Sequence, residues 1–326
     1  MLVEDIRLDK CKELIYKISE DSIIRLYDAI QNYLFQNIHY ERVISNMPMW
    51  VADAGCTPEV PISKEWYDAD KQAFTHPICR KFIYYYDIWN VISALQDRLQ
   101  SVEMFLLNFY SGISSVATAS EEQYTSSTRN MGIHETGTHI TLNSIFVALA
   151  SAFDLFSKIA YEHYHKLEYG DFSGYSKMVC RNTLFNVNGV DVHPELKEPG
   201  MLFSPSKDVA TIVTFRSEYV HNGPWDRRCS VYCTYIDEEP SDCIIYSPDI
   251  DEQGRFVSSG ARNKFFNQRN RINFILPDII LSVLRSLGAS IHKLIELYER
   301  ETVLSVDEAL TEECVKATEE YYKSLK

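Results

Sequence analysis

The chain has 326 residues, a formal net charge of −14, and few glycines and prolines, 12 and 11 respectively. The shortage of Gly and Pro argues against a turn-rich all-β protein and for long helices. The acidic charge excludes broad, nonspecific affinity for nucleic acid but permits a local basic site. The longest apolar run, Ile145–Phe153, is too short to span a bilayer, and the first ten residues lack a secretory apolar segment. We therefore expect a cytoplasmic protein with reduced cysteines and no membrane partner.

The first third of the chain is predicted to be helical. Apolar residues recur every three to five positions across residues 4–46, and again across 80–110, where the spacing indicates one long packed helix. The intervening segment, 47–78, holds four prolines and predicts an irregular connection.

A change of composition marks the expected domain boundary. Residues 114–139 are rich in Ser, Thr and Glu and poor in large apolar side chains, which favours a linker or mobile loop. We therefore predict an N-terminal helical region over 1–125 and a second domain over 126–326.

The second domain is predicted to begin with two helices. A broad apolar face predicts the first helix over 141–167. Ser206 is expected to cap the second helix, because its hydroxyl can accept hydrogen bonds from the free amides of the first turn. That helix is expected to end near His221, since Gly223 favours a helix end and Pro224 cannot continue it.

A small β insertion is predicted at about 229–260. Short β-like runs at 230–236, 243–246 and 255–258 are separated by polar turns, which indicates a hairpin or meander. After the insertion, Pro277 is expected in the first turn of a helix that runs to about Glu299. An acidic helix over 306–322 is expected to close the chain.

Three pairs of Arg and His have the spacing of a metal-free RNA-cleaving site, in which Arg holds phosphate oxygens and His moves protons. The pairs are Arg216/His221, Arg129/His134 and Arg285/His292. The second pair lies in the polar loop and the third on an apolar helix, so the pair at the helix end is the best candidate. On a helix, five residues are about 140° of rotation, so Arg216 and His221 would meet only through a distorted helix end or a second copy of the chain. In the alternative interpretation, Arg216 pairs with Glu218 or Asp226, and His221 only caps the helix.

Residues 255–271 combine positive charge with aromatic rings. They include five basic residues, no acidic residue and three interleaved Phe residues. Cations and aromatic rings together suit a single-stranded nucleic acid. The predicted nucleic-acid contacts are Arg262, Lys264, Arg269 and Arg271. In the alternative interpretation, this segment is a solvated loop whose Phe side chains pack inward.

Metal and cofactor sites are not expected. One group of residues has suitable metal-ligand types: Cys229, Cys233, Cys243 and His221. A strand over 230–236, however, would separate the first two cysteines by roughly 13 Å, which is too far for one zinc ion. His134 and His139 have one residue too many between them for the zinc-protease pattern. Because a phosphate-cradling Gly-rich loop is also missing from the sequence, we expect neither a metal nor a cofactor.

The segment Phe215-Arg216-Ser217-Glu218-Tyr219-Val220-His221-Asn222-Gly223 is similar to the Arg-polar-x-x-x-His motif of the HEPN superfamily. Residues 144–161, with an internal acid at Asp154, resemble the amphipathic helix of that family. The resemblance covers 141–300. It implies a mainly α fold, an up-and-down helical bundle that dimerises, here with an N-terminal helical extension and a small β insertion.

The resemblance also implies roles for single residues. Arg216 would stabilise the phosphate and His221 would transfer protons in a metal-independent ribonuclease, in which the ribose 2′-OH attacks the adjacent phosphate. The supporting polar residues would be Ser217, Asp154 and Asn222. Two positions depart from the pattern: Ser217 stands where Asn is common, and Gly223 stands where silenced toxins often carry Tyr.

These observations lead to three hypotheses of function. The first is a homodimeric HEPN-type endoribonuclease in antiviral defence or toxin–antitoxin biology, with RNA as substrate and a cognate antitoxin or defence protein as partner. The second is a noncatalytic HEPN module that binds RNA or a nucleotide. The third is a structural helical protein that interacts through its acidic surface.

Overall fold

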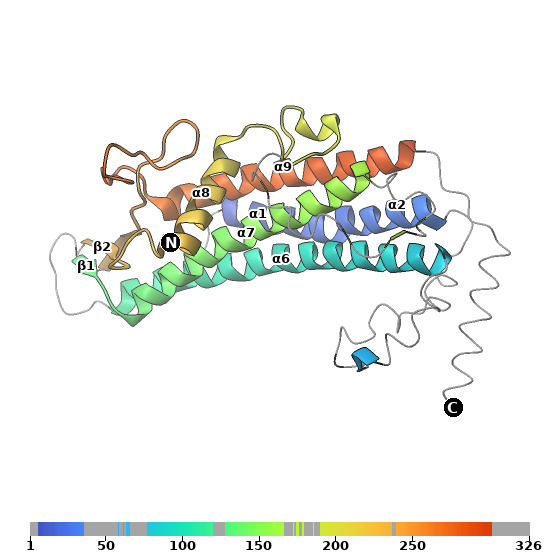
Figure 1. The fold of residues 1–326 in the computed structure, drawn as a ribbon. Helices are drawn as coiled ribbons and strands as arrows, with labels where there is room; N and C mark the ends of the chain where they lie inside the picture. Colours follow the sequence, from blue (N-terminus) through green and yellow to red (C-terminus); the bar gives the residue numbers. More distant parts are fainter. Residues whose placement is uncertain are drawn as a thin grey trace. The chain divides into compact units, whose positions relative to one another are not determined.

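The structure is a computed structural model, which describes residues 6–35, 77–119, 128–165, 190–236 and 239–301 together with isolated positions between 58 and 185. Helices dominate, so the predicted mainly α fold is confirmed (Figure 1). The expected helix over 306–322 and the end of the helix predicted over 4–46 lie outside the described residues.

The chain forms two compact units that interleave in sequence. The first unit comprises Met1–Ser22, Leu95–Asp154 and Pro194–Ser290, and the second comprises Ile23–Ala94, Leu155–His193 and Ile291–Lys326. Residues on both sides of the expected boundary at 125/126 therefore belong to the first unit.

The first unit is a helical bundle with a small sheet. Its helices are α1 (Ile6–Lys17), a π-helical turn (Ile18–Ser22), a short 3-10 helix (Pro194–Lys197), α8 (Lys207–Asn222), and the parts of α6 (Pro77–Ala119), α7 (Ile133–His165) and α9 (Ile272–Arg300) that belong to this unit. Figure 1 shows α8 beside α7, near the sheet. The apolar faces predicted from sequence periodicity are buried in this bundle, as Phe146, Ile212 and Leu284 illustrate, each fully inaccessible to solvent.

The second unit is held together by aromatic side chains. It contains α2 (Ile23–Phe35) and the remaining parts of α6, α7 and α9. The ring of Phe35 packs edge-on against Tyr85 at 5.6 Å between centroids, and Tyr84 packs edge-on against Tyr175 at 5.2 Å. Such edge-to-face pairs add to the stability gained by burying the rings.

The prediction of a linker or mobile loop over 114–139 is wrong for most of the described residues in this range. Helix α6 continues to Ala119, a strand occupies Thr128–Asn130, and α7 already begins at Ile133. The hydroxyl groups of these polar stretches find their partners within the helix, because they donate hydrogen bonds to the backbone carbonyl four residues earlier. The donors are Ser114, Ser115, Thr136, Thr138 and Thr141.

Helix α9 begins five residues earlier than expected, because Pro277 lies inside it rather than in its first turn. A proline inside a helix leaves the carbonyl four residues before it without its usual amide donor. Here that carbonyl belongs to Asn273, and the hydroxyl of Tyr110 donates to it at 2.7 Å. A side chain from α6 therefore replaces the missing backbone bond.

The predicted β insertion is present, but it belongs to a three-stranded antiparallel sheet. The strand order is β1 (Thr128–Asn130), β2 (Val231–Ile236) and β3 (Glu239–Ile244). The strand expected at 243–246 is therefore shifted towards the N-terminus. The run at 255–258 contributes only an isolated bridge, between Phe256 and Ile250.

Two helices, α7 and α9, are long and apolar enough to cross a membrane by length and composition alone. Within their most apolar windows, 61% and 56% of the residues are buried inside the structure. Both helices supply core residues of the bundle, and this burial accounts for their composition.

Candidate functional site

The helix that carries Arg216 and His221 has the ends predicted from the sequence. At its start, the hydroxyl of Ser206 accepts a hydrogen bond from the amide of Val209 at 3.4 Å. At its end, Gly223 has a φ of 86° and donates its amide to the carbonyl of Tyr219. That backbone angle favours glycine, so Gly223 ends α8 directly after the Arg/His motif.

The inner face of α8 is fixed by an aromatic cluster around Phe215, which is completely buried. Its ring stacks on Phe146 of α7 at 4.6 Å between centroids. Trp225 and Phe256 pack against it edge-on at 4.8 and 5.0 Å. Because these partners come from three separate segments, the cluster sets both the rotation of α8 and the start of the 255–271 loop.

Arg216 and His221 lie on the outer part of the same helix. The Arg216 side chain is half-buried and that of His221 is exposed. Within the described ranges, neither side chain makes a hydrogen bond or an ion pair. Their separation of about 140° around α8 places them on different flanks of one chain. The structure therefore leaves both groups available but does not join them within one subunit.

In the alternative interpretation, Arg216 pairs with Glu218 or Asp226. Both of these acids have other hydrogen-bond partners. Glu218 accepts hydrogen bonds from the Lys264 ammonium and, at 2.8 Å, from the Asn222 amide. Asp226 accepts from the backbone amides of Arg228 and Ser230, at 2.9 and 2.8 Å. Neither acid forms an ion pair with Arg216 in the part of the chain that the structure describes.

The pairing of Glu218 with Lys264 joins the motif helix to the basic segment. Burial raises the pKa of Glu218, but the hydrogen bonds from Lys264 and Asn222 outweigh burial and bring that pKa below its ordinary value. Lys264 was expected to contact nucleic acid and Asn222 to support the motif. Both side chains donate hydrogen bonds to Glu218, and Lys264 thereby anchors the loop to α8.

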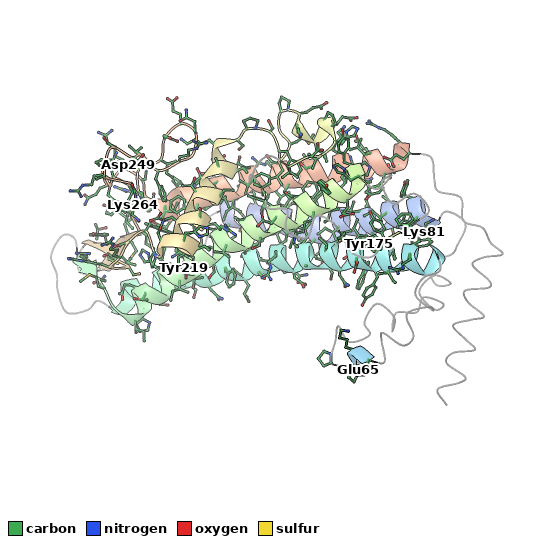
Figure 2. All side chains as sticks on the ribbon, viewed as in Figure 1. Glu65, Lys81, Tyr175, Tyr219, Asp249 and Lys264 are labelled. Atoms are coloured by element: carbon green, nitrogen blue, oxygen red, sulfur yellow. The ribbon has the colours of Figure 1, made fainter. Side chains whose placement is uncertain are left out.

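The 255–271 loop is held against α8 at a second point. Gly254, with a φ of 80°, lies so close to α8 that a Cβ atom there would come within 2.3 Å of the Lys207 carbonyl oxygen. Within the loop region, the Asp249 amide donates to the carbonyl of Phe265 at 2.7 Å. Figure 2 shows Asp249 and Lys264 near α8, which carries Tyr219. Contacts just before the loop and near its middle therefore define its course.

The outward side of this loop carries the charges and rings that were predicted to bind nucleic acid. Arg262, Arg269 and Arg271 are exposed. Phe265 and Phe266 are 39% and 45% exposed. The alternative interpretation, in which the Phe side chains pack inward, therefore describes Phe256 but not the other two. Exposed rings beside guanidinium groups can stack on bases and hold phosphates.

The Arg129/His134 pair has different surroundings from those expected. Arg129 lies on β1 rather than in a loop, and its guanidinium donates to the hydroxyl of Ser230 at 2.8 and 3.0 Å. His134 is exposed in the first turn of α7. Arg129 thus helps to hold β1 beside β2.

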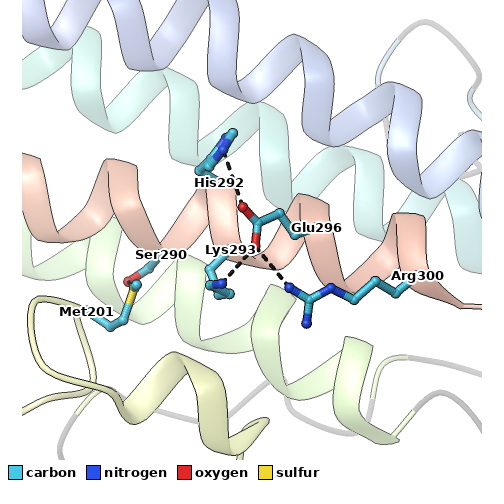
Figure 3. Close-up of polar contacts among 6 residues, drawn as sticks. All are labelled: Met201, Ser290, His292, Lys293, Glu296 and Arg300. Atoms are coloured by element: carbon cyan, nitrogen blue, oxygen red, sulfur yellow. Dashed lines mark hydrogen bonds and ion pairs between the residues drawn. The ribbon is translucent and has the colours of Figure 1, made fainter.

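His292, from the third pair, belongs to a charged cluster on α9 (Figure 3). Its Nε2 lies 3.5 Å from a carboxylate oxygen of Glu296. The same carboxylate forms ion pairs with the Lys293 ammonium at 2.7 Å and the Arg300 guanidinium at 3.3 Å. Lys293 is the main reason that the pKa of Glu296 is lowered. Arg285 is exposed on α9, and the ion pairs of this cluster do not include it.

The remaining supporting residues differ in position. Ser217 is half-buried beside Arg216 in α8. Asp154 lies on α7 eight residues beyond Phe146, about 12 Å along the helix axis. This direction leads away from Trp225, the end of the cluster near His221. The structure therefore keeps Ser217 with the motif and does not bring Asp154 to His221.

Sequence reasoning missed a buried histidine beneath the end of α8. His139 is 1% exposed, its Nε2 lies 3.1 Å from the carbonyl oxygen of Ser230, and its ring is 6.1 Å from that of Trp225. Burial lowers the pKa of His139, against smaller opposing effects of the Ser230 carbonyl and Asp226. A neutral ring that donates from Nε2 fits this site. The Trp225 contact is long-range, so spacing gave no signal for it.

Two of the cysteines considered as metal ligands lie opposite each other on adjacent strands. Cys233 of β2 pairs in register with Cys243 of β3, and both are buried free thiols. Among the described residues, no group of three or more His, Cys, Asp or Glu side chains could hold a metal ion.

Comparison with family models, curated proteins and solved structures gives no match to this chain. The residues of α8 and of the loop beside it are therefore what indicates a function.

Proposed function

We propose that the protein is a metal-independent endoribonuclease of the HEPN type that acts as a homodimer. The observation that carries this proposal is the state of Arg216 and His221: both lie on the outer part of α8, without hydrogen bonds or ion pairs to other described residues. A free guanidinium and a free imidazole at the end of a rigid helix are suited to phosphate binding and proton transfer.

In this proposal each group has one chemical task. The 2′-OH of a ribose attacks the adjacent phosphate, and the 5′-oxygen of the next nucleotide leaves. Arg216 holds the phosphate oxygens as negative charge accumulates on them, and His221 transfers a proton to or from the reacting oxygens. Ser217, next to Arg216, would help to orient the guanidinium.

The geometry of α8 favours a site shared between two subunits. One chain presents Arg216 and His221 on different flanks of the helix, about 140° apart. Two α8 helices related by a two-fold axis would place the arginine of one subunit beside the histidine of the other, because such an interface brings the same surface from both chains together.

The exposed loop supports RNA as the substrate. Glu218, which anchors the loop through Lys264, lies about 60° from His221 and about 160° from Arg216 around the helix. An RNA strand bound to Arg269 and Phe266 would therefore approach α8 from the flank that carries His221. The proposal includes action in the cytoplasm, in defence or toxin–antitoxin biology, with a cognate antitoxin or defence partner.

The decisive experiment measures RNA cleavage in EDTA by the parent chain and by Arg216→Ala and His221→Ala. We expect each substitution to lower the cleavage rate by about 100- to 10,000-fold, as removal of a proton-transfer group does. The control is Arg285→Ala, which removes an exposed arginine far from α8 in sequence and should leave the rate unchanged. Equal rates for all four proteins would contradict the assignment.

Mixing the two inactive variants tests the shared site. A mixed dimer contains one intact arginine and one intact histidine on opposite subunits. If the site is shared, random exchange of subunits should restore about a quarter of the parental activity, because half of the dimers would each have one complete site. No recovery after verified subunit exchange would place both groups in one chain and refute the shared site.

A noncatalytic RNA-binding module is the second candidate. It is favoured by the exposed Phe265 and Phe266, which can bind bases whether or not α8 cleaves. RNA binding without cleavage by the parent chain would support this alternative. Loss of that binding in an Arg269→Ala/Arg271→Ala variant would locate it on the loop.

A further inference from the structure

Cys233 and Cys243 are placed for a covalent bond. They are directly opposed in the antiparallel pair β2–β3. Opposed residues in such a pair have Cα atoms about 4.5–5.5 Å apart, and a disulfide requires about 4.4–6.8 Å. The two side chains could therefore be bridged without rearranging the strands.

The two thiols already interact. Their paired positions place each thiol in the surroundings of the other. The neighbouring Cys243 is the main reason that the pKa of Cys233 is lowered; Asn130 of β1 acts in the same direction, and burial and Glu135 oppose it. Cys233 and burial in turn raise the pKa of Cys243. Cys233 is thus the sulfur that more readily becomes a thiolate.

We propose that Cys233 and Cys243 form a dithiol site that reacts with small-molecule disulfides by thiol–disulfide exchange. The Cys233 thiolate attacks one sulfur of the small disulfide, forms a mixed disulfide and releases one small thiolate. Cys243 gives its proton to that thiolate and attacks the Cys233 sulfur, which releases the second thiolate; this second thiolate takes from water the proton that Cys233 had lost. Two protein thiols are oxidised to an intrachain disulfide, and one small disulfide is reduced to two thiols.

The position of the pair gives the bond a structural consequence. In the described sheet β3 lies at one side, next to β2 only, so the pair can be reached when β3 separates locally. Cys233 and Cys243 are 0% and 4% exposed, so we expect slow reaction through such opening. Strand β2 follows α8, and β3 precedes the 255–271 loop. The disulfide would therefore lock the hairpin that lies between the Arg/His motif and the basic loop, and would prevent the local separation of β3 from β2.

The test uses the full chain with oxidised glutathione as the probe. After incubation, the remaining thiols are alkylated under denaturing conditions, and the chain is cleaved after glutamate. Glu238 and Glu239 lie between the two cysteines, so their peptides stay together only through a disulfide. We expect mass spectrometry to find Cys233 and Cys243 joined in most chains, and dithiothreitol to separate them.

Two variants distinguish the attacking sulfur from the resolving sulfur and test whether Cys229 takes part. Cys243→Ser should accumulate a glutathione adduct on Cys233, because the resolving thiol is gone. Cys229→Ser should form the 233–243 crosslink as the parent does, since Cys229 hydrogen-bonds to the Asp226 carbonyl at 3.7 Å and lies before β2. Parent chains that remain fully alkylated at Cys233 and Cys243 would overturn the proposal, and so would loss of the crosslink in Cys229→Ser. This covalent readout needs neither RNA nor cleavage, so it is independent of the proposed ribonuclease activity.

Discussion

The inner and outer sides of α8 are built on opposite principles. On the inner side, Phe215 is completely buried and contacts three aromatic rings. On the outer side, Arg216 and His221 have no polar partner among the described residues, although they follow Phe215 by only one and six positions. The contacts on the inner side hold α8 in place, whereas the outer side carries two reactive groups without polar partners among the described residues.

This difference shows how a rigid support and a free site can share one helix. A catalytic group needs a fixed backbone, but a side chain that is already paired must break that pairing before it can bind substrate. The aromatic cluster and the Glu218–Lys264 pair fix α8 and the loop without using either motif residue. The comparison predicts that stability and activity respond to different substitutions on the same helix.

The largest expected effect is that of Phe215→Ala. Removing a fully buried ring from a packed cluster should reduce the free energy of unfolding by about 3–5 kcal/mol. Urea unfolding followed by circular dichroism measures this change. The matched control is Val220→Ala, whose side chain is 50% exposed on the outer side and should change stability by less than about 0.5 kcal/mol. Similar losses in both variants would erase the distinction between the two sides.

A smaller loss is expected from Lys264→Met. The side chains of Lys264 and Glu218 are 25% and 15% exposed, so the substitution leaves a largely buried carboxylate without its cation. We expect a loss of about 1–2 kcal/mol, measured by urea unfolding, together with faster proteolysis of the 255–271 loop. Arg269→Met is the control, because its exposed side chain should affect the salt dependence of RNA binding but not stability. Unchanged stability in Lys264→Met would show that Lys264 is not an anchor.

The next effect is that of Ser206→Ala, which removes the N-terminal cap of α8. The hydrogen bond to the Val209 amide is long, at 3.4 Å, so we expect a loss of about 0.5–1 kcal/mol in urea unfolding. Ser206→Asp keeps an acceptor at the same position and should retain the stability of the parent. A loss in Ser206→Asp equal to that in Ser206→Ala would argue against capping.

The parts of this fold that were predictable depend on neighbouring residues in the sequence. Ser206 and Gly223-Pro224 define α8 by local hydrogen bonding and backbone geometry, and both ends were predicted correctly. The start of α9 was missed because Tyr110, distant in sequence, satisfies the Asn273 carbonyl. For the site, the exposure of the Arg/His motif and of the Phe rings could not be predicted, since it depends on which long-range partners cover each side of α8.

The smallest expected effect concerns His139, which packs beneath Trp225 on the inner side. It appears only at acidic pH. Its folded pKa lies below its ordinary value of 6.5, mainly because of burial. Above about pH 6.5 the ring is neutral in both the folded and the unfolded chain, so the full stability is present. As the pH falls towards the folded pKa, only the unfolded chain takes up the proton, and stability is lost. Urea unfolding at pH 7.5 and pH 5 should show a larger loss for the parent than for His139→Gln, which cannot be protonated. Parallel losses in the two proteins would mean that other groups cause the acid sensitivity and that the inner side of α8 does not depend on a neutral His139.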